Sequence, residues 1–480
     1  MSVIRDDAIE NALQQGIERT LRYRGAPPDN WVEPAAGTDH DVLIVGGGQN
    51  ALALVWTLRH LGIRRVTAIE AKPAGQAGIW RDTARMRTLR TQKTLTGPDM
   101  GFTPLSFATW YDAHQGEGAF DAVGQIDRID WGNYLSWFEQ AAHIGVRHEI
   151  RVAGLSPEGA FFRVHLESPG RTWTEVARKV VFANGIGGLG QPVLPAFLTQ
   201  ALPPAHYGHT ADRLDFEALR GRSVGIIGSA ASAFDAAAVA LEQGAADVHM
   251  FCRKDIPPTL QINKSRNYIA AQDRFFTLPD ALRWTLFDRA QKAGTAPPAD
   301  SVRRLLGHAN FRLHTGRDLS GLSLEGGRIR LPFDGPALDF IVAGTGYAQD
   351  ANTCTALSGV SHRLAQWGDR HRPGQDEANA ILSRYPYLGA AFEFLPKDPA
   401  EPLPWAGNLH AFTPAAGLSF GRYIGDVPSM RFAVNHLSQA VFDSFFREDL
   451  AVHERRMRVV PEDLEFDPSL YAPLLSPPAP

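Results

Sequence analysis

The sequence has few cysteines, no long apolar run and no excess of one charge. Only two cysteines, Cys252 and Cys354, occur in 480 residues, which excludes a disulfide framework and a C-x-x-C redox pair. No stretch approaches the run of about 18 apolar residues that a membrane-spanning helix needs, so no membrane partner is expected. The 48 basic residues are balanced by 52 acidic ones, and this balance gives no sign of a nucleic-acid partner.

Metal ligands and an export signal are also missing from the sequence. The 16 histidines show no spacing typical of metal ligands, so no metal site is predicted. The N-terminal 25 residues are charged and lack the apolar core of a secretory signal, which together with the cysteine content predicts a cytoplasmic location. The length suits two or three globular domains.

One strand–turn–helix–strand pattern occurs twice in the chain. The first copy reads DVLIV, GGGQNA, ALALVWTLRHLG and VTAIE from Asp41 onward. The second copy reads SVGII, GSAASA, FDAAAVALEQG and VHMFCRK from Ser223 onward. Continuous apolar runs of this length are typical of strands buried on both faces. The repeat predicts two nucleotide-binding domains, because the copies are too far apart for a solenoid.

The first turn fits the dinucleotide pattern G-x-G-x-x-A. Gly46 permits the tight turn, Gly48 lets a pyrophosphate approach the backbone, and Ala51 lets the helix pack closely. Glu70 ends the second strand, where a carboxylate can accept hydrogen bonds from ribose hydroxyls. The motif alone also occurs in unrelated loops, but strand, helix and acid agree here. They predict a cofactor with free ribose hydroxyls, FAD or NAD.

The second turn departs from this pattern. Ala230 replaces the middle glycine, and its Cβ would crowd a pyrophosphate. Arg253 and Lys254 follow the second strand, where a cation selects the 2′-phosphate of NADPH. The alternative is a solvated charge pair without a ligand. The two turns together predict FAD in the first site and NADPH in the second.

Electrons that pass from NADPH to a flavin need an acceptor. A disulfide acceptor is excluded because paired cysteines are absent. No iron–sulfur or haem motif occurs either. By elimination, the predicted acceptor is molecular oxygen.

Four further motifs follow one another between about residues 40 and 450. They are Gly75-x-x-Gly78-Ile79-Trp80, Ile126-x4-Trp131-x2-Tyr134-Leu135, Phe182-Ala-Asn-Gly185, and Asp339-x3-Ala343-Gly-Thr-Gly-Tyr347. This order resembles the class B flavin-dependent monooxygenases, which include flavin-containing monooxygenases, Baeyer–Villiger monooxygenases and amine N-hydroxylases. Asn184 and the extra glycine before Thr345 depart from the family's pattern.

The resemblance implies an α/β fold with two Rossmann-like, dinucleotide-binding domains, the NADPH domain inserted into the FAD domain. The expected division is 1–39 for an N-terminal helix and linker, 40–205 and 339–450 for the FAD domain, 206–338 for the NADPH domain and 451–480 for a tail.

The expected site residues lie at the strand ends, turns and loops of these motifs. Arg90, Lys93 and Tyr347 are the candidate catalytic residues, although the basic loop that carries Arg90, Thr91 and Lys93 could equally be a solvated turn. The expected cofactor-binding residues are Gly46, Gly48, Gln49, Asn50, Ala51, Glu70, Ala71, Gly78, Ile79, Trp80, Arg90, Thr91, Val152, Gly185, Gly228, Ser229, Ala230, Ser232, Ala233, Arg253, Lys254, Gly346, Tyr347 and Asp426.

The expected reaction is insertion of one oxygen atom from O2 into a small-molecule substrate. NADPH would reduce FAD, and a flavin hydroperoxide would deliver oxygen to a nucleophilic nitrogen or sulfur atom. Three alternatives stay open: Baeyer–Villiger oxygenation of a ketone, a flavin oxidase or oxidoreductase without oxygen insertion, and a non-catalytic redox-sensing binder. His209 lies where Baeyer–Villiger enzymes have a histidine, but Pro203 and Arg213 break the rest of that fingerprint. The oligomeric state is open, with a homodimer as one expectation.

A competing motif, G-x-S-x-G, occurs at Gly417, Ser419 and Gly421. A hydrolase elbow needs a strand before it, a helix directly after it, and a later Asp and His. The glycine and proline residues that follow predict a loop instead, so a serine hydrolase is disfavoured. By resemblance this loop covers the flavin, with Gly425 and Asp426 near it, and His410 is expected to be a buried structural histidine.

Overall fold

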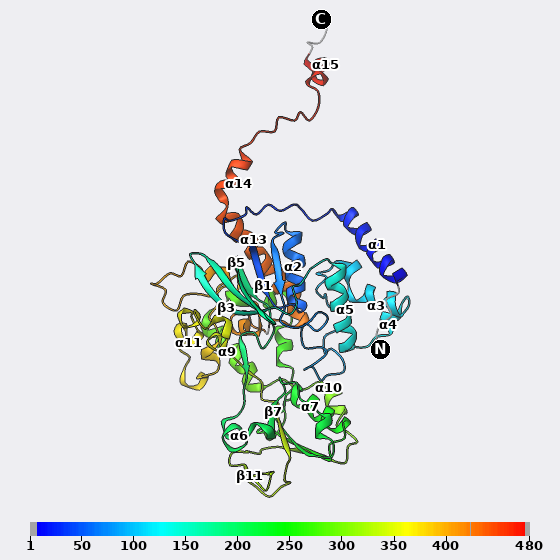
Figure 1. Ribbon diagram of the computed structural model, residues 1–480, viewed down its shortest axis with the longest axis vertical. Coiled ribbons are helices and arrows are strands. Elements are labelled where there is room, and N and C mark those ends of the chain that lie inside the picture. Colours follow the sequence, from blue (N-terminus) through cyan, green and yellow to red (C-terminus); the bar gives the residue numbers. More distant parts are fainter. Residues whose placement is uncertain (1–6, 423, 476–480) are drawn as a thin grey trace.

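The computed structural model describes residues 7–422 and 424–475, which form a mixed α/β fold around two sheets (Figure 1). The first sheet has the order β2-β1-β5-β4-β3, and β15 also pairs with β5. Strands β1, β2, β5 and β15 run parallel, whereas β3, β4 and β5 form an antiparallel meander. The strands are β1 (His40–Val45), β2 (Val66–Ile69), β3 (Arg151–Glu158), β4 (Phe161–Ser168), β5 (Arg171–Phe182) and β15 (Leu409–Ala411).

Strand β5 joins the two halves of this sheet. Its first half pairs with β4 and is partly exposed, while residues 177–182 are buried and pair with β1 and β15. The buried half reads as a continuous apolar run apart from Arg178 and Lys179, as expected for a parallel strand covered on both faces. The carboxyl ends of β1, β5 and β15 therefore lie together at one edge.

The second sheet is entirely parallel, with the order β10-β9-β8-β13-β7. All strands of the second sheet lie between β5 and β15 in the chain. Strand β13, which follows residue 338, belongs to this sheet because it pairs with β7 and β8. Its strands are β7 (Tyr207–His209), β8 (Ser223–Ile227), β9 (Asp247–Phe251), β10 (Phe311–His314) and β13 (Phe340–Ala343).

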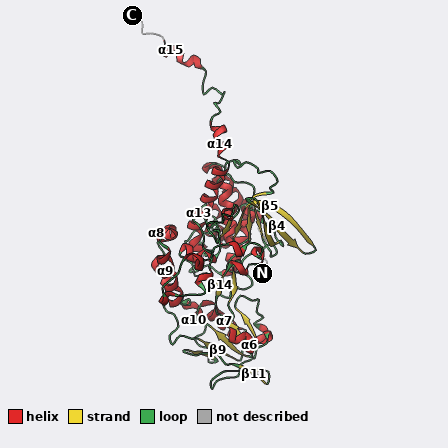
Figure 2. Cartoon of the chain, turned by 90° about the vertical axis from the view of Figure 1, so that its left-hand side faces the viewer, coloured by secondary structure: helices red, strands yellow, loops and turns green. Residues whose placement is uncertain are grey.

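The chain crosses between the two bodies through a short two-stranded ribbon. Strands β6 and β14 pair antiparallel there, and Figure 2 shows β14 between the upper and lower bodies. Two further strands, β11 and β12, form a hairpin at the far end of the lower body (Figure 1). These strands are β6 (Gly190–Pro192), β14 (Tyr347–Gln349), β11 (Ser323–Glu325) and β12 (Arg328–Arg330).

Helices cover both sheets. The long helix α13 packs against α2 and α8, and α7 packs on β8 and β9. None of the helices in the described residues is long and apolar enough to cross a membrane. The helices are α1 (Asp7–Arg24), α2 (Gln49–His60), α3 (Phe107–Gln115), α4 (Ala119–Ala122), α5 (Arg128–Ala141), α6 (Ala196–Ala201), α7 (Ala231–Glu242), α8 (Ile269–Arg274), α9 (Asp280–Ala293), α10 (Ala299–Arg303), α11 (Trp367–Arg370), α12 (Gly417–Phe420), α13 (Val427–Glu448), α14 (Leu450–Met457) and α15 (Ala472–Leu475).

Candidate active site

The first glycine turn is closed on one side and open on the other. Gly46 has φ of +119°, and a Cβ there would lie 2.7 Å from the Ala183 carbonyl oxygen at the end of β5. A Cβ at Gly48 would meet no protein atom within 4 Å. Glycine is therefore required at position 46 by the fold, whereas Gly48 leaves space on the surface of the turn.

Helix α2 begins at this open side. Gly48 is its N-cap, and no side chain of the described residues caps the helix there. The N–H groups and the positive end of the helix dipole can therefore bind an anion such as a pyrophosphate. Glu70 braces the turn from the side, because its Oε2 accepts a hydrogen bond from Gly47 N at 2.8 Å and its Oε1 from Lys72 N at 2.9 Å. Each carboxylate oxygen keeps a second lone pair for a ribose hydroxyl.

Two side chains of the first turn of α2 point into the protein. The Gln49 amide donates to the Gly425 carbonyl oxygen at 2.7 Å and accepts from Trp131 Nε1 at 3.0 Å. Asn50 Oδ1 is buried and has no hydrogen-bond donor among the described residues. An unpartnered buried acceptor beside an open glycine turn fits a bound group that brings its own donor, as FAD does. Gln49 instead links the start of α2 to Gly425 and to Trp131 on α5.

The start of α13 lies beside the start of α2. The Asp426 side chain caps α13 by accepting from Ser429 N at 2.8 Å, and Arg422 Nη2 lies 3.3 Å from Asp426 Oδ2. Gly425 is tied to Gln49, as described above. The structure thus places Asp426 at the edge of the sheet where the sequence expected a cofactor, with a structural role as a helix cap.

The second turn repeats the geometry of the first. Gly228 has φ of +128°, and a Cβ there would collide with the Gly344 carbonyl oxygen at the end of β13. A Cβ at Gly344 would in turn lie 2.7 Å from Ala233 Cβ. The extra glycine that departs from the family's pattern is thus required by close packing on α7. Ala230, the exposed N-cap of α7, stands where Gly48 stands in the first turn.

The strand pairings also align the residues that follow β2 and β9. Gly46 N donates to Ile69 O at 2.7 Å, and Gly228 N donates to Phe251 O at 3.0 Å. The buried Cys252 is therefore the counterpart of Glu70, and Arg253 comes one position later than the sequence pattern suggested.

Arg253 and Lys254 have different surroundings. Lys254 Nζ donates to the carbonyl oxygens of Lys292 at 2.7 Å and Ala293 at 2.9 Å, which closes the C-terminal end of α9. Arg253 is exposed. Of the two cations, Arg253 is the one whose side chain is available to a phosphate.

The candidate catalytic residues of the basic loop are engaged elsewhere. Arg90 Nη2 lies 3.4 Å from Asp235 Oδ2 on α7, and burial lowers the pKa of its guanidinium. Lys93 Nζ donates to the carbonyl oxygens of Phe120 at 2.8 Å and Asp121 at 3.0 Å, at the end of α4. Thr91 between them is half-buried. The loop therefore joins three parts of the structure, and these contacts do not bring Arg90 and Lys93 together.

Tyr347 lies where the chain returns from the second sheet to the first. Its ring meets the buried His209 ring edge to face, with centroids 5.4 Å apart, and burial raises the pKa of its hydroxyl. Arg85 Nη1 and Nη2 donate to the carbonyl oxygens of Thr210 at 2.5 Å and Asp212 at 2.8 Å. Arg85 directly precedes the basic loop but is not among the site residues that the motifs predict.

Comparisons with known proteins agree with this geometry. Residues 43–187 match a family model described as FAD-NAD(P)-binding. The FAD-dependent urate hydroxylase of Xanthomonas campestris pv. campestris is 35% identical over 448 residues, which cover 92% of this chain and 93% of that protein.

Solved structures of amine hydroxylases share the fold. The ornithine hydroxylase of Pseudomonas aeruginosa has a TM-score of 0.65 at 16% identity and covers 84% of this chain and 99% of its own. The Kutzneria sp. 744 ornithine N-hydroxylase, solved with reduced FAD, NADP+ and L-ornithine, has a TM-score of 0.62 at 15% identity, with 85% and 99% covered.

The chain belongs to the class B flavin monooxygenases. It is a flavin-dependent hydroxylase, an oxidoreductase, as the order of its motifs predicted. The mixed α/β fold with parallel sheets of the dinucleotide-binding kind is confirmed as well.

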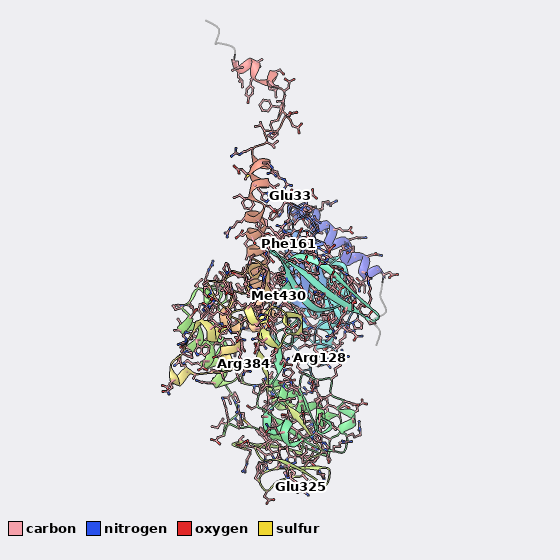
Figure 3. The ribbon with its side chains drawn as sticks, turned by 60° about the vertical axis from the view of Figure 1, so that its left-hand side comes forward. Glu33, Arg128, Phe161, Glu325, Arg384 and Met430 are labelled. Atoms are coloured by element: carbon pink, nitrogen blue, oxygen red, sulfur yellow. The ribbon has the colours of Figure 1, made fainter. Side chains whose placement is uncertain are left out.

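The remaining predicted residues of this monooxygenase lie in three places. Arg128, which lies at the start of α5 and is labelled in Figure 3, donates to the Trp80 carbonyl oxygen, and the Trp80 ring meets Trp131 edge to face. Val152 is buried in β3, whereas Ala71 lines a hollow of about 580 Å³ beside the β4–β5 turn. The other positions are on the surface or half-buried: Ser232 in the first turn of α7, and the loop residues Gly78, Ile79, Gly185, Ser229 and Gly346.

The hydrolase alternative is wrong for this monooxygenase. Ser419 lies inside the short helix α12, is fully buried, and its Oγ accepts from Trp367 Nε1 at 3.3 Å and Leu388 N at 3.4 Å. A nucleophile elbow would expose this oxygen at a strand–helix turn. His410 is buried as expected, with a pKa lowered to about 4 by burial and by the Lys179 charge.

Proposed function

We propose that this monooxygenase uses FAD and NADPH to hydroxylate urate or a closely related purine. One observation carries the proposal: the urate hydroxylase is 35% identical over nearly the whole chain. The ornithine hydroxylases are 15–16% identical, which supports a common fold only. One atom of O2 would enter the ring and the other would leave as water, with NADPH supplying the two electrons. The favoured reaction thus moves from nitrogen or sulfur oxygenation to ring hydroxylation.

The first site would hold FAD, which supplies two-electron redox chemistry and the reaction with O2. The open face at Gly48 and the uncapped start of α2 would take the pyrophosphate, and Glu70 would accept from the ribose. Asn50 Oδ1 would gain the donor that it lacks. In this proposal residues 40–205 and the part after β13 form the FAD domain.

The second site would hold NADPH. Its support is the repeated turn at Gly228, the uncapped start of α7 and the exposed Arg253. The Kutzneria enzyme of the same fold was solved with NADP+. Ala230 would weaken binding of the pyrophosphate, because it is the N-cap of α7 as Gly48 is of α2 and brings a Cβ to that position.

The three candidate catalytic residues would then have different roles. Arg90 positions the second domain through Asp235, and Lys93 holds its own loop against α4. Tyr347 remains the candidate that touches cofactor or substrate, because it is half-buried at the ribbon between the two sheets.

Purified holoenzyme tests the proposal by its consumption of NADPH and of O2. Urate should accelerate NADPH oxidation, and mass spectrometry should find a product one oxygen heavier with little hydrogen peroxide released. If urate leaves the rate unchanged and peroxide accounts for all NADPH consumed, the substrate assignment is wrong.

Ornithine, lysine and cadaverine test the second candidate, amine N-hydroxylation, which the fold neighbours favour. Ketones test Baeyer–Villiger oxygenation, and flavin reduction by substrate without NADPH would indicate an oxidase.

A further inference from the structure

An arm formed by residues 459–475 follows α14 and extends away from the rest of the molecule (Figures 1 and 2). All of its residues are exposed. Of the 23 large hydrophobic side chains exposed in the described residues, eight lie in this arm: Val459, Val460, Leu464, Phe466, Leu470, Tyr471, Leu474 and Leu475. So dense a set of exposed apolar side chains marks a contact surface.

The charged residues of the arm are all acidic. It carries Glu462, Asp463, Glu465 and Asp467 and no basic residue. An apolar and acidic segment fits a surface that is apolar and basic.

One surface of the same chain has that character. Residues 253–274, here called the linking segment, follow β9 and include α8. The segment exposes Ile256, Leu260, Tyr268 and Ile269. Its charged residues are Arg253, Lys254, Lys264, Arg266 and Arg274 against Asp255 and Asp273, which leaves a basic excess.

We propose that the arm of one copy docks on the linking segment of a second copy, and that the exchange is reciprocal. Helix α13 starts beside α8, and its 22 residues carry the chain about 33 Å away at roughly 1.5 Å per residue. The arm leaves from this far end and points outward (Figure 1). In a dimer with two-fold symmetry, each arm binds the linking segment of the other copy, so neither arm is left unbound.

The exchange would also affect the second site. Arg253, the candidate for the 2′-phosphate, belongs to the linking segment, and α8 packs on α13. An arm from the partner copy would cover the stretch of chain between the two nucleotide sites. This inference is independent of the substrate.

Sedimentation velocity of the holoenzyme over a wide range of concentration tests the exchange. The full chain should form a dimer, and a chain that stops after Arg458 should be a monomer with the same flavin content and thermal midpoint. Equal masses for the two chains, or a full chain that stays monomeric at every concentration, would overturn the proposal.

Charge reversal then tests which surfaces meet. The arm variant E462K/D463K/E465K and the segment variant K264E/R274E should each dissociate to monomers, because the arm of the first becomes net basic and the segment of the second becomes net acidic, so both contacts of either homodimer become repulsive. An equimolar mixture should form dimers again, since each arm then meets a segment of opposite charge. If either variant alone stays dimeric, or the mixture stays monomeric, the arm does not dock on the linking segment of a second copy.

Discussion

Arg90 and Asp235 form an ion pair between the first domain and helix α7 of the second, with Nη2 3.4 Å from Oδ2. Asp235 is buried and accepts a further hydrogen bond from Ser301 Oγ at 2.6 Å. A second pair, Arg87 with Glu242 at 2.7 Å, joins the same loop to the other end of α7. The loop therefore holds the helix at whose start the second nucleotide site is proposed.

We expect R90A and D235N to slow the reduction of FAD by NADPH by roughly ten- to a hundredfold, with bound FAD unchanged. The reason is that small displacements of a bound reactant cost rate on this scale. Anaerobic stopped-flow absorbance measures the reduction directly.

The double variant R90A/D235N separates positioning from direct action. If the two residues act as one pair, the double variant should be no slower than the slower single variant. A normal rate in D235N beside a slow R90A would mean instead that Arg90 acts on the cofactor itself. The unfolding midpoint serves as a control, because Asp235 also holds Ser301.

Gly46 and Gly48 should respond differently to substitution with alanine. G48A should fold with an unchanged midpoint and lose FAD, because its Cβ meets no protein atom but occupies the face offered to the pyrophosphate. G46A should be destabilised by roughly 1–3 kcal/mol, because its φ is positive and its Cβ would press on Ala183 O. Flavin absorbance per chain and urea unfolding distinguish the two outcomes. Retention of FAD by G48A would contradict the assignment of this turn.

The sequence predicted the two nucleotide units well because each depends on local chemistry. The apolar run of β1, the turn at Gly46 and the acid at Glu70 lie within one short stretch of chain. The contacts of Arg90 and Lys93 could not be predicted in this way. Their partners, Asp235 and Phe120, lie outside the loop in the sequence. The sequence of a basic loop is also the same whether the loop contacts a flavin or a neighbouring helix.

The strand end at Arg253 shows what spacing alone can and cannot predict. Glu70 lies 24 residues after Gly46 and Cys252 lies 24 residues after Gly228, so the spacing and the pairing of β8 with β9 both align Cys252, not Arg253, with Glu70. The adjacent cations Arg253 and Lys254 predict one charged pair, whereas Lys254 caps α9, a helix that starts 26 residues later in the chain.

Arg253 and Lys254 should therefore differ in their effect on cofactor choice. R253A should raise the KM for NADPH roughly tenfold and leave that for NADH nearly unchanged, because a lost contact to the 2′-phosphate costs about 1.4 kcal/mol or more. K254A should leave the KM values for NADPH and NADH unchanged. It should lower the unfolding midpoint slightly, since two carbonyl groups at the end of α9 lose their donor. Steady-state kinetics with each nucleotide measure the two KM values. A larger change in K254A than in R253A would reverse the assignment.

His410 should make stability depend on pH below neutrality. Burial and the Lys179 charge lower its pKa to about 4, from an unfolded value near 6.5. The unfolded chain therefore binds a proton that the folded chain excludes, so the free energy of unfolding should fall as the pH drops from about 6.5 to 4. The slope is at most about 1.4 kcal/mol per pH unit.

H410N should be less stable at neutral pH, because it loses packing in the core, but its free energy of unfolding should depend less steeply on pH between about 6.5 and 4. The exposed His362 gives the matched control, since H362N should keep the full slope. Urea unfolding at a series of pH values measures both, and an unchanged slope in H410N would show that another group titrates.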